Sequence, residues 1–394
     1  MSFWDKRAEE FLIDRFKEGL SWPAIRKAFI EAEFDNVPSK DAIRMKGYTL
    51  TSGNELTLEE RKKARRVKIN ASKVAKEGRA ILDGLNLTDD IMTKFEALVK
   101  KVKTKQYKPV ELGYRKDGCD MIIEVLLSDL HFGKKTKTFN YAIARRRIKE
   151  LGRQVIMSVH DKTDQGYNVV RLDIALMGDI IESSTMHGEE SLKSCEFGNS
   201  EQMVKATDSL FHDFLEPVLH LGIPLIINGI PGNHERTEKR KTFKNPGREY
   251  MSFVIYNFLK MLIEKCYPTA DTTFNISDGP LLLHKIFNDN VLYEHGDLLK
   301  AGTKNAMMNM LAKRCTQLNT LIEFYRVGHL HETTTFDRGR VMINGCLPGQ
   351  DDYSEAHGFR TEASQTINFY CENKNRPNSF YYSYHPFLGS ADNV

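Results

Sequence analysis

From Asp120 onward, apolar and polar positions follow two alternating periods. Short apolar runs rich in β-branched residues predict strands in MIIEVLLSD, RLDIALMGD and IPLIINGI. Helical spacing predicts helices over about 138–160, 200–221 and 248–264. Further β-rich segments lie around 272–276, 281–286 and 291–295, and then in FYRVGHL, TTTFD, RVMING, TINFY and SFYYSY. Alternating elements followed by a β-rich tail predict an α/β core whose sheets pack between helices.

The first fifty residues predict short helices. Phe11 and Phe16 belong to an apolar stripe, Ser21 can cap the next helix, and Ser39 can cap a short basic helix over Lys40–Lys46. Helix, turn and basic helix is the plan of a helix-turn-helix module, whose last helix enters a DNA groove. Any small helical bundle gives a similar pattern, so both interpretations stay open.

Changes of character along the chain predict three regions. Residues 1–54 are expected to form the helix-turn-helix-like module, with a turn or linker over its last residues, 47–54. Residues 55–118 are expected to form a basic helical linker region, and residues 119–394 a catalytic domain.

Composition narrows the class of protein. With 394 residues, 41% hydrophobic and 28% charged, the chain is not wholly disordered and has room for two or three domains. Six scattered cysteines without a CxxC pair predict reduced thiols. The N-terminal MSFWDKRAEE lacks the apolar stretch of a secretory signal, and no apolar run approaches the ~18 residues of a membrane span. A cytoplasmic protein is expected, in the host cytoplasm if it is encoded by a phage.

Charge is unevenly distributed. Residues 1–118 carry 26 Lys and Arg against 19 Asp and Glu, whereas the remainder carries 31 against 34. Such asymmetry predicts a segment that contacts nucleic acid, although a solvated helical surface gives the same count. The candidate contacts to nucleic acid are Lys40, Arg44, Lys46, Arg61, Lys62, Lys63, Arg65, Arg66, Arg236, Lys239, Arg240 and Lys241.

Polar residues follow five of the predicted strands at the point where each strand ends. The seven that offer oxygen or nitrogen ligands are Asp129, His131, Asp179, Asn233, His295, His329 and His331. In α/β folds, functional residues gather beyond the carboxyl ends of strands. Seven ligands are enough for two divalent ions if one carboxylate bridges them.

The ligand types indicate which metal and which chemistry to expect. Imidazole and carboxylate together suit Mn²⁺, Fe or Zn²⁺ better than Ca²⁺, with Mn²⁺ the first choice and Mg²⁺ also open. Two metals about 4 Å apart can polarise a phosphoryl group and activate water. His234 is left over beside the ligands, where it can donate a proton to a leaving group. Each short motif is common by chance. The informative feature is that all five motifs occur in this order and that each follows a predicted strand.

The pattern D-x-H, GD, GNHE, H and GHxH over about residues 120–350 resembles the calcineurin-like metallophosphoesterase superfamily. The resemblance implies a sandwich of two mixed sheets flanked by helices, here with a small all-α N-terminal domain added. It implies that Asp129, His131, Asp179 and His331 bind one metal, that Asp179 bridges, and that Asn233, His295 and His329 complete the second site. By the same resemblance His234 is the catalytic histidine.

Departures from the family pattern narrow the activity. Protein phosphatases carry GDxVDRG, whereas this chain has GDIIESS from Gly178, without the phosphate-gripping arginine. The site pattern resembles that of repair exonucleases, so a DNA nuclease of phage or bacterial type is expected. The alternatives are a phosphatase or phosphodiesterase of small nucleotides and, in another class, a DNA-binding regulatory protein with a vestigial site. No membrane partner is expected; self-association and an ATPase partner stay open.

Overall fold

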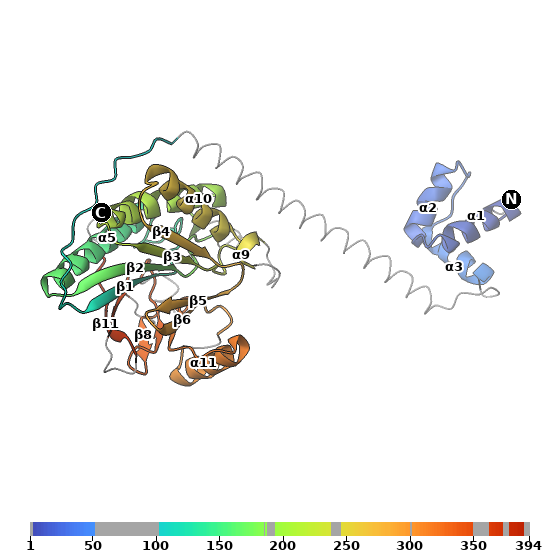
Figure 1. Ribbon diagram of the computed structural model, residues 1–394. Helices are drawn as coiled ribbons and strands as arrows, with labels where there is room; N and C mark the ends of the chain where they lie inside the picture. The colour runs from blue at the N-terminus through green and yellow to red at the C-terminus, as the bar shows by residue number, and fades with distance from the viewer. Residues whose placement is uncertain are drawn as a thin grey trace. The chain divides into compact units, whose positions relative to one another are not determined.

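A computed structural model describes residues 3–51, 102–184, 186, 194–237, 246–299, 302–349, 362–372 and 378–389. The chain divides into two compact units, Met1–Asp83 and Gly84–Val394, each of which is described by itself (Figure 1). The predicted basic linker region lies mostly outside the described residues, so its fold stays a prediction.

The described part of the smaller unit consists of helices α1 (Lys6–Lys17), α2 (Trp22–Glu31) and α3 (Lys40–Thr51). They pack around a core of Ala8, Leu12, Ile25, Phe29 and Ile43. The predicted cap of the third helix is confirmed, because Ser39 Oγ accepts a hydrogen bond from the backbone N–H of Ala42 at 3.3 Å.

The turn predicted to begin at Gly47 is wrong, because α3 continues to Thr51. A Cβ atom on Gly47 would lie 2.6 Å from the indole ring of Trp22. The glycine therefore allows helix and ring to approach closely and does not end the helix.

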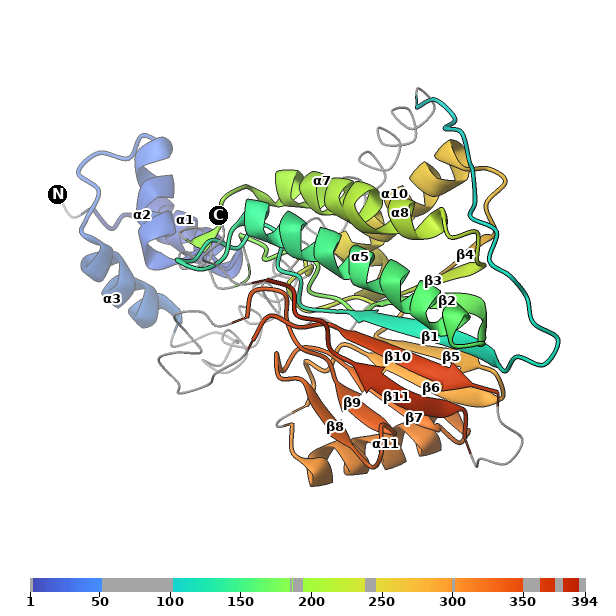
Figure 2. The same cartoon turned by 90° about the vertical axis from the view of Figure 1, so that its left-hand side faces the viewer.

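The larger unit contains two sheets that face each other (Figure 2). The first has strand order β11-β10-β1-β2-β3-β4. Strands β1 to β4 are parallel to one another, β10 pairs antiparallel with β1, and β11 pairs antiparallel with β10. Its strands are β1 (Asp120–Leu127), β2 (Asn168–Leu176), β3 (Leu225–Gly229), β4 (Thr272–Ile276), β10 (Thr366–Cys371) and β11 (Phe380–Tyr384).

The second sheet has strand order β5-β6-β7-β9-β8, with β6, β7 and β9 parallel. Its strands are β5 (Leu281–Ile286), β6 (Asp289–Glu294), β7 (Phe324–Val327), β8 (Thr334–Phe336) and β9 (Val341–Ile343). The predicted α/β class is confirmed: two mixed sheets flanked by helices, plus a small helical N-terminal part.

Helices cover the outer face of each sheet (Figure 2). Against the first sheet lie α5 (Tyr141–Asp164), α7 (Asn199–Ser209), the π-helical η1 (Leu210–Leu215), α8 (Glu216–Leu219) and α10 (Met251–Cys266). The short α9 (Pro246–Glu249) precedes α10 and packs against it. Against the second lies α11 (Lys304–Leu318), which sequence analysis missed. None of the helices in the described ranges is both long and apolar enough to cross a membrane.

Strand β1 shows how the layers are built. Met121, Ile123 and Val125 point into the core under the helices, whereas Ile122 and Leu126 point into the layer between the sheets. This alternation follows from the two-residue period of a strand. Both faces of β1 are therefore buried, as its largely apolar sequence predicted.

Candidate metal centre

Five strands deliver the predicted ligands to one place. The loops that carry them follow β1, β2 and β3 in the first sheet and β6 and β7 in the second. The first three strands are parallel to one another, and so are the last two, so the carboxyl ends within each set meet at one edge. The structure brings all seven residues together there, in two neighbouring clusters.

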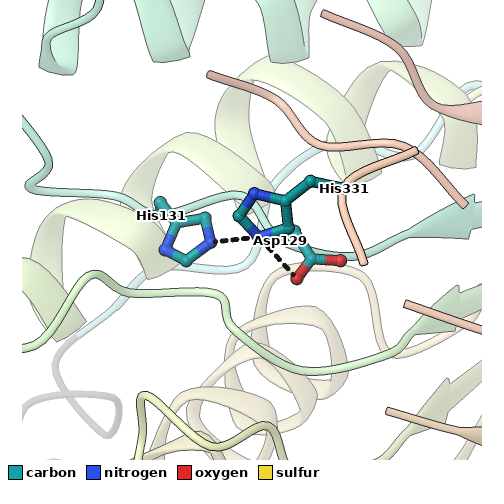
Figure 3. A group of neighbouring side chains, drawn as sticks. All are labelled: Asp129, His131 and His331. Carbon is teal, nitrogen blue, oxygen red and sulfur yellow. Dashed lines mark hydrogen bonds and ion pairs between the residues drawn. The ribbon is translucent and has the colours of Figure 1, made fainter. Parts of the chain in front are cut away.

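The first cluster consists of Asp129, His131 and His331, whose ligand atoms all lie within 4.8 Å of one another (Figure 3). The Nε2 atoms of the two imidazoles face each other at 3.1 Å. His331 Nε2 also lies 3.2 Å from Asp129 Oδ1. Nitrogen and oxygen donors thus converge on a single point.

The second cluster consists of Asp179, His295 and His329. His295 Nε2 lies 3.2 Å from Asp179 Oδ2 and 3.0 Å from Asn233 Oδ1. Asn233 therefore joins this cluster. The backbone N–H of His234 donates to Asp179 Oδ1 at 2.8 Å, which places the predicted catalytic histidine beside it.

The backbone at these ligands is strained. Asp129, His131, Asp179, His329 and His331 all have left-handed φ values, between 48° and 67°. Residues with a Cβ rarely adopt this conformation, and it persists only where the surroundings impose it. Strain concentrated at Asp and His residues in this way is typical of a functional site.

Hydrogen bonds orient two of the imidazoles. The backbone carbonyl of Met177 accepts from His295 Nδ1 at 2.8 Å, which leaves His295 Nε2 as the ligand atom. His131 Nδ1 lies 2.8 Å from the Glu182 carboxylate, which likewise directs His131 Nε2 into the first cluster.

Glu182 also serves His234, because its backbone carbonyl accepts from His234 Nδ1 at 2.5 Å. Burial alone would raise the pKa of Glu182, but His131 outweighs it and the pKa falls to about 2. In the sequence, Glu182 stands out only as a departure from GDxVDRG. Its position three residues after the predicted ligand Asp179 was the feature that could have indicated a role beside the metal site.

Glu235 ties the second and third loops together. Its carboxylate accepts from the backbone N–H of Gly232 at 2.9 Å, of Asp179 at 3.1 Å and of Ile180. Burial and the neighbouring Asp179 raise the pKa of Glu235 to about 7. A Cβ atom on Gly232 would lie 2.1 Å from the backbone nitrogen of Asp179, so only glycine allows this approach.

Charges within the clusters compensate one another. Burial alone would raise the pKa of Asp129, but His331 outweighs it and the pKa falls to about 2. Burial would lower the pKa of His295, but the Asp179 carboxylate raises it to about 10. Burial lowers the pKa of His131 to about 4, against the effect of its carboxylate partner, and so favours the neutral ligand form.

The donor set fits divalent cations. Each cluster offers a buried carboxylate, a buried imidazole and a half-buried imidazole, and facing Nε2 atoms are the arrangement that a shared cation satisfies. Asp129, His131 and His331 would hold one ion; Asp179, Asn233, His295 and His329 would hold the other. Bridging by Asp179 stays a prediction.

The predicted contacts to nucleic acid have varied positions. Lys40 is exposed, Arg44 lies 3.3 Å from Asp41, and Lys46 lies 2.5 Å from Glu9. Residues 1–51 carry equal numbers of cationic and acidic side chains, nine of each, so the helical module has no net charge of its own.

Of the remaining candidates, Arg236 is buried and pairs with Asp297. The others lie outside the described residues: Arg61, Lys62, Lys63, Arg65, Arg66, Lys239, Arg240 and Lys241.

Comparison with known proteins adds little. No protein-family model and no curated protein matches the sequence.

Three solved structures illustrate the structural matches. An archaeal phosphodiesterase shares 12% identity over 67% of this chain and 98% of its own, with a TM-score of 0.31. Zinc-complexed Vps29 from Entamoeba histolytica shares 12% over 68% and 99%, with a TM-score of 0.28. A conserved protein from Streptococcus pneumoniae, titled as a predicted phosphoesterase, shares 10% over 68% and 97%, also at 0.28. Likeness at this level carries no weight for function, which rests on the site itself.

Proposed function

We propose that the chain is a metal-dependent phosphoesterase of the calcineurin-like class that hydrolyses phosphodiester bonds in nucleic acid. The observation that carries the proposal is the pair of Asp and His clusters at the strand ends. Five loops, separated by up to 202 residues between Asp129 and His331, supply both clusters together with a histidine that neither cluster uses.

Two divalent ions bound by these residues would polarise the phosphoryl oxygens and activate a water molecule. The chain's own contribution is to fix the ligands. The Glu182 and Met177 acceptors hold the imidazoles of His131 and His295 in one tautomer, and five of the ligands have left-handed backbone at the strand ends. The site is thereby organised before substrate arrives.

His234 is the residue proposed to move a proton. Its Nδ1 donates to the Glu182 carbonyl, so its Nε2 is the atom left for the reaction. His234 Nε2 lies 3.8 Å from Asp179 Oδ2, and its side chain is 11% exposed, more than Asp179 at 1%. In its imidazolium form, which carries a proton on both ring nitrogens, His234 can protonate the departing alcohol oxygen through Nε2.

A nucleic-acid substrate is supported by charge. The excess of cations in residues 1–118 falls after the helical module, and the exposed Lys135 and Lys137 follow the first metal motif. Such groups can neutralise backbone phosphates without reading sequence. The helix-turn-helix-like module would then target the polymer.

Incubating the full-length protein with end-labelled linear and circular DNA and RNA, with and without Mn²⁺, tests the proposal. Metal-dependent shortening of a polymer is expected, and product sizes distinguish endonuclease from exonuclease action. His234→Ala is expected to lose hydrolysis of bis-p-nitrophenyl phosphate. His160→Ala, which alters an exposed histidine on α5, is the matched control. Equal turnover by wild type and His234→Ala would reject the mechanism.

A second candidate, hydrolysis of small nucleotides, is favoured by one observation: the balanced charge of residues 1–51, in which Arg44 and Lys46 lie beside acidic side chains. The helices would then serve assembly. Turnover of cyclic or dinucleotide substrates, with no cleavage of either polymer, would select this candidate. A regulatory protein with a vestigial site would cleave neither.

A further inference from the structure

A buried ion pair lies beside the second cluster. Arg236 Nη2 donates to Asp297 Oδ2 at 2.5 Å, with exposed side-chain fractions of 8% and 22%. Removing one partner of a buried ion pair strongly destabilises a fold, because the other charge then stays buried without compensation. The pair therefore constrains the two loops that carry it.

These two loops hold neighbouring ligands of the second cluster. Arg236 lies three residues after Asn233, in the loop that follows β3. Asp297 lies two residues after His295, in the loop that follows β6. Asn233 Oδ1 and His295 Nε2 are 3.0 Å apart, so the ion pair closes a ring that passes through both ligands.

Each loop is also fixed to its surroundings. The backbone carbonyl of Glu235 accepts from the N–H of Met251 at 2.8 Å, and the Tyr250 hydroxyl hydrogen-bonds Arg236. Gly296, with a φ of 105°, packs so closely that a Cβ atom would lie 2.5 Å from Val327 Cγ1. The pair therefore joins two segments that are each anchored at another point, and it restrains the separation of the parts that carry the ligands.

We propose that Arg236 and Asp297 are positioning residues that hold Asn233 and His295 at the separation needed to share one divalent cation. The inference rests on the proposed metal centre and gives Arg236 a role other than the predicted phosphate contact. A phosphate contact needs an exposed guanidinium, whereas this one is buried against a carboxylate. The pair is expected to affect the second metal site alone, because no ligand of the first cluster lies on either loop.

Calorimetric titration of metal-free full-length protein with Mn²⁺ tests this without relying on turnover. Wild type is expected to bind two ions. In Asp297→Asn and Arg236→Lys, the affinity of one site is expected to fall by about 10–100-fold, the usual cost of losing an outer partner of a ligand, while the other site is unchanged. Asp297→Asn keeps the side-chain shape, and circular dichroism checks that both variants fold.

Arg248 and Asp278 provide the matched control. Arg248, in α9, and Asp278, between β4 and β5, form a second Arg–Asp pair at 2.8 Å, but both side chains are exposed. Asp278→Asn is expected to leave both Mn²⁺ affinities at wild-type values.

The possible failures are distinguishable. Two wild-type affinities retained in Asp297→Asn would overturn the positioning role, and a raised KM for DNA in Arg236→Lys would then support a phosphate contact. Equal weakening of both sites in either variant would also overturn it, since the effect would then be general. Absence of Mn²⁺ binding by wild type would instead reject the metal centre on which the inference rests.

Discussion

Two regions of the larger unit that bury carboxylates beside cationic or imidazole groups differ in their backbone and bonding. The contrast between them separates a structural role from the proposed functional one. Between the sheets, Glu124 and Arg326 are fully buried, 3.3 Å apart. Glu124 also accepts from Tyr293 at 2.6 Å and from Tyr370 and Asn368, each at 2.7 Å. The residues of this network lie on regular strands, and their donors satisfy the hydrogen-bonding capacity of the Glu124 carboxylate.

At the strand ends, the ligand groups contact one another, but their donor atoms converge on shared points. The Nε2 atoms of His131 and His331 face each other, and the backbone of five ligands is left-handed. Polar groups that satisfy one another stabilise a fold, whereas strained donors that converge on one point are arranged for something else to bind. The first region is therefore interpreted as structural and the second as functional.

The largest expected effect separates the two regions by activity. Asp179→Asn removes a ligand charge from the second cluster, so hydrolysis of bis-p-nitrophenyl phosphate is expected to fall by more than about 100-fold, beyond the usual cost of losing an outer partner. The unfolding midpoint is expected to stay near that of wild type. A variant that retained turnover would remove Asp179 from the site.

The converse substitution is expected to affect stability. Arg326→Met leaves the Glu124 carboxylate buried without its cation, which is expected to lower the free energy of unfolding by about 3–5 kcal/mol. Denaturant melts measure the loss, and turnover per folded molecule is expected to be unchanged. Loss of turnover without loss of stability would contradict the structural role.

A smaller effect is expected at Glu182. Glu182→Gln weakens the acceptor for His131 Nδ1 but keeps the backbone carbonyl that orients His234. Activity or Mn²⁺ affinity is expected to fall by about 10–100-fold. Glu150→Gln, at a half-buried position on α5 beside Arg153, is the control and is expected to match wild type.

The smallest effect concerns a carboxylate that belongs to neither region. Burial alone would raise the pKa of Glu216, but hydrogen bonds from Lys105, Tyr267 and His212 outweigh it and lower the pKa to about 2. Because the folded-state pKa is depressed, the stabilisation is present above the unfolded pKa, about 4.3, and is lost as the pH falls toward 2. Acid melts of Glu216→Gln are therefore expected to show a shallower loss of stability across that window. If wild type and Glu216→Gln lost stability equally as the pH falls, these hydrogen bonds would contribute nothing to the free energy of unfolding.

The elements that sequence analysis predicted correctly are those with a strong period. In the described part of the chain, all eleven strands lie in segments predicted from apolar or β-rich runs. Helix α11 was missed because only Met307 and Leu311 are buried in its fifteen residues, too weak a stripe to stand out. Gly47 was mistaken for a turn because sequence does not reveal that it faces Trp22.

The ligands themselves were predictable because each follows a strand, and the structure gathers them. Their supporting residues were not. The Glu235 carboxylate accepts from the backbone N–H of Asp179, which lies 56 residues away in the chain. The backbone carbonyl of Glu182 accepts from His234 Nδ1 on another loop. Arg236 looked like part of a basic loop, and only the fold brings Asp297 to it.

Anomalous diffraction from a crystal of the full-length protein soaked in Mn²⁺ tests the central claim most directly. Two peaks are predicted, one among Asp129, His131 and His331 and the other among Asp179, Asn233, His295 and His329. Soaked crystals with no anomalous peak at the ligand atoms of either cluster would contradict the account.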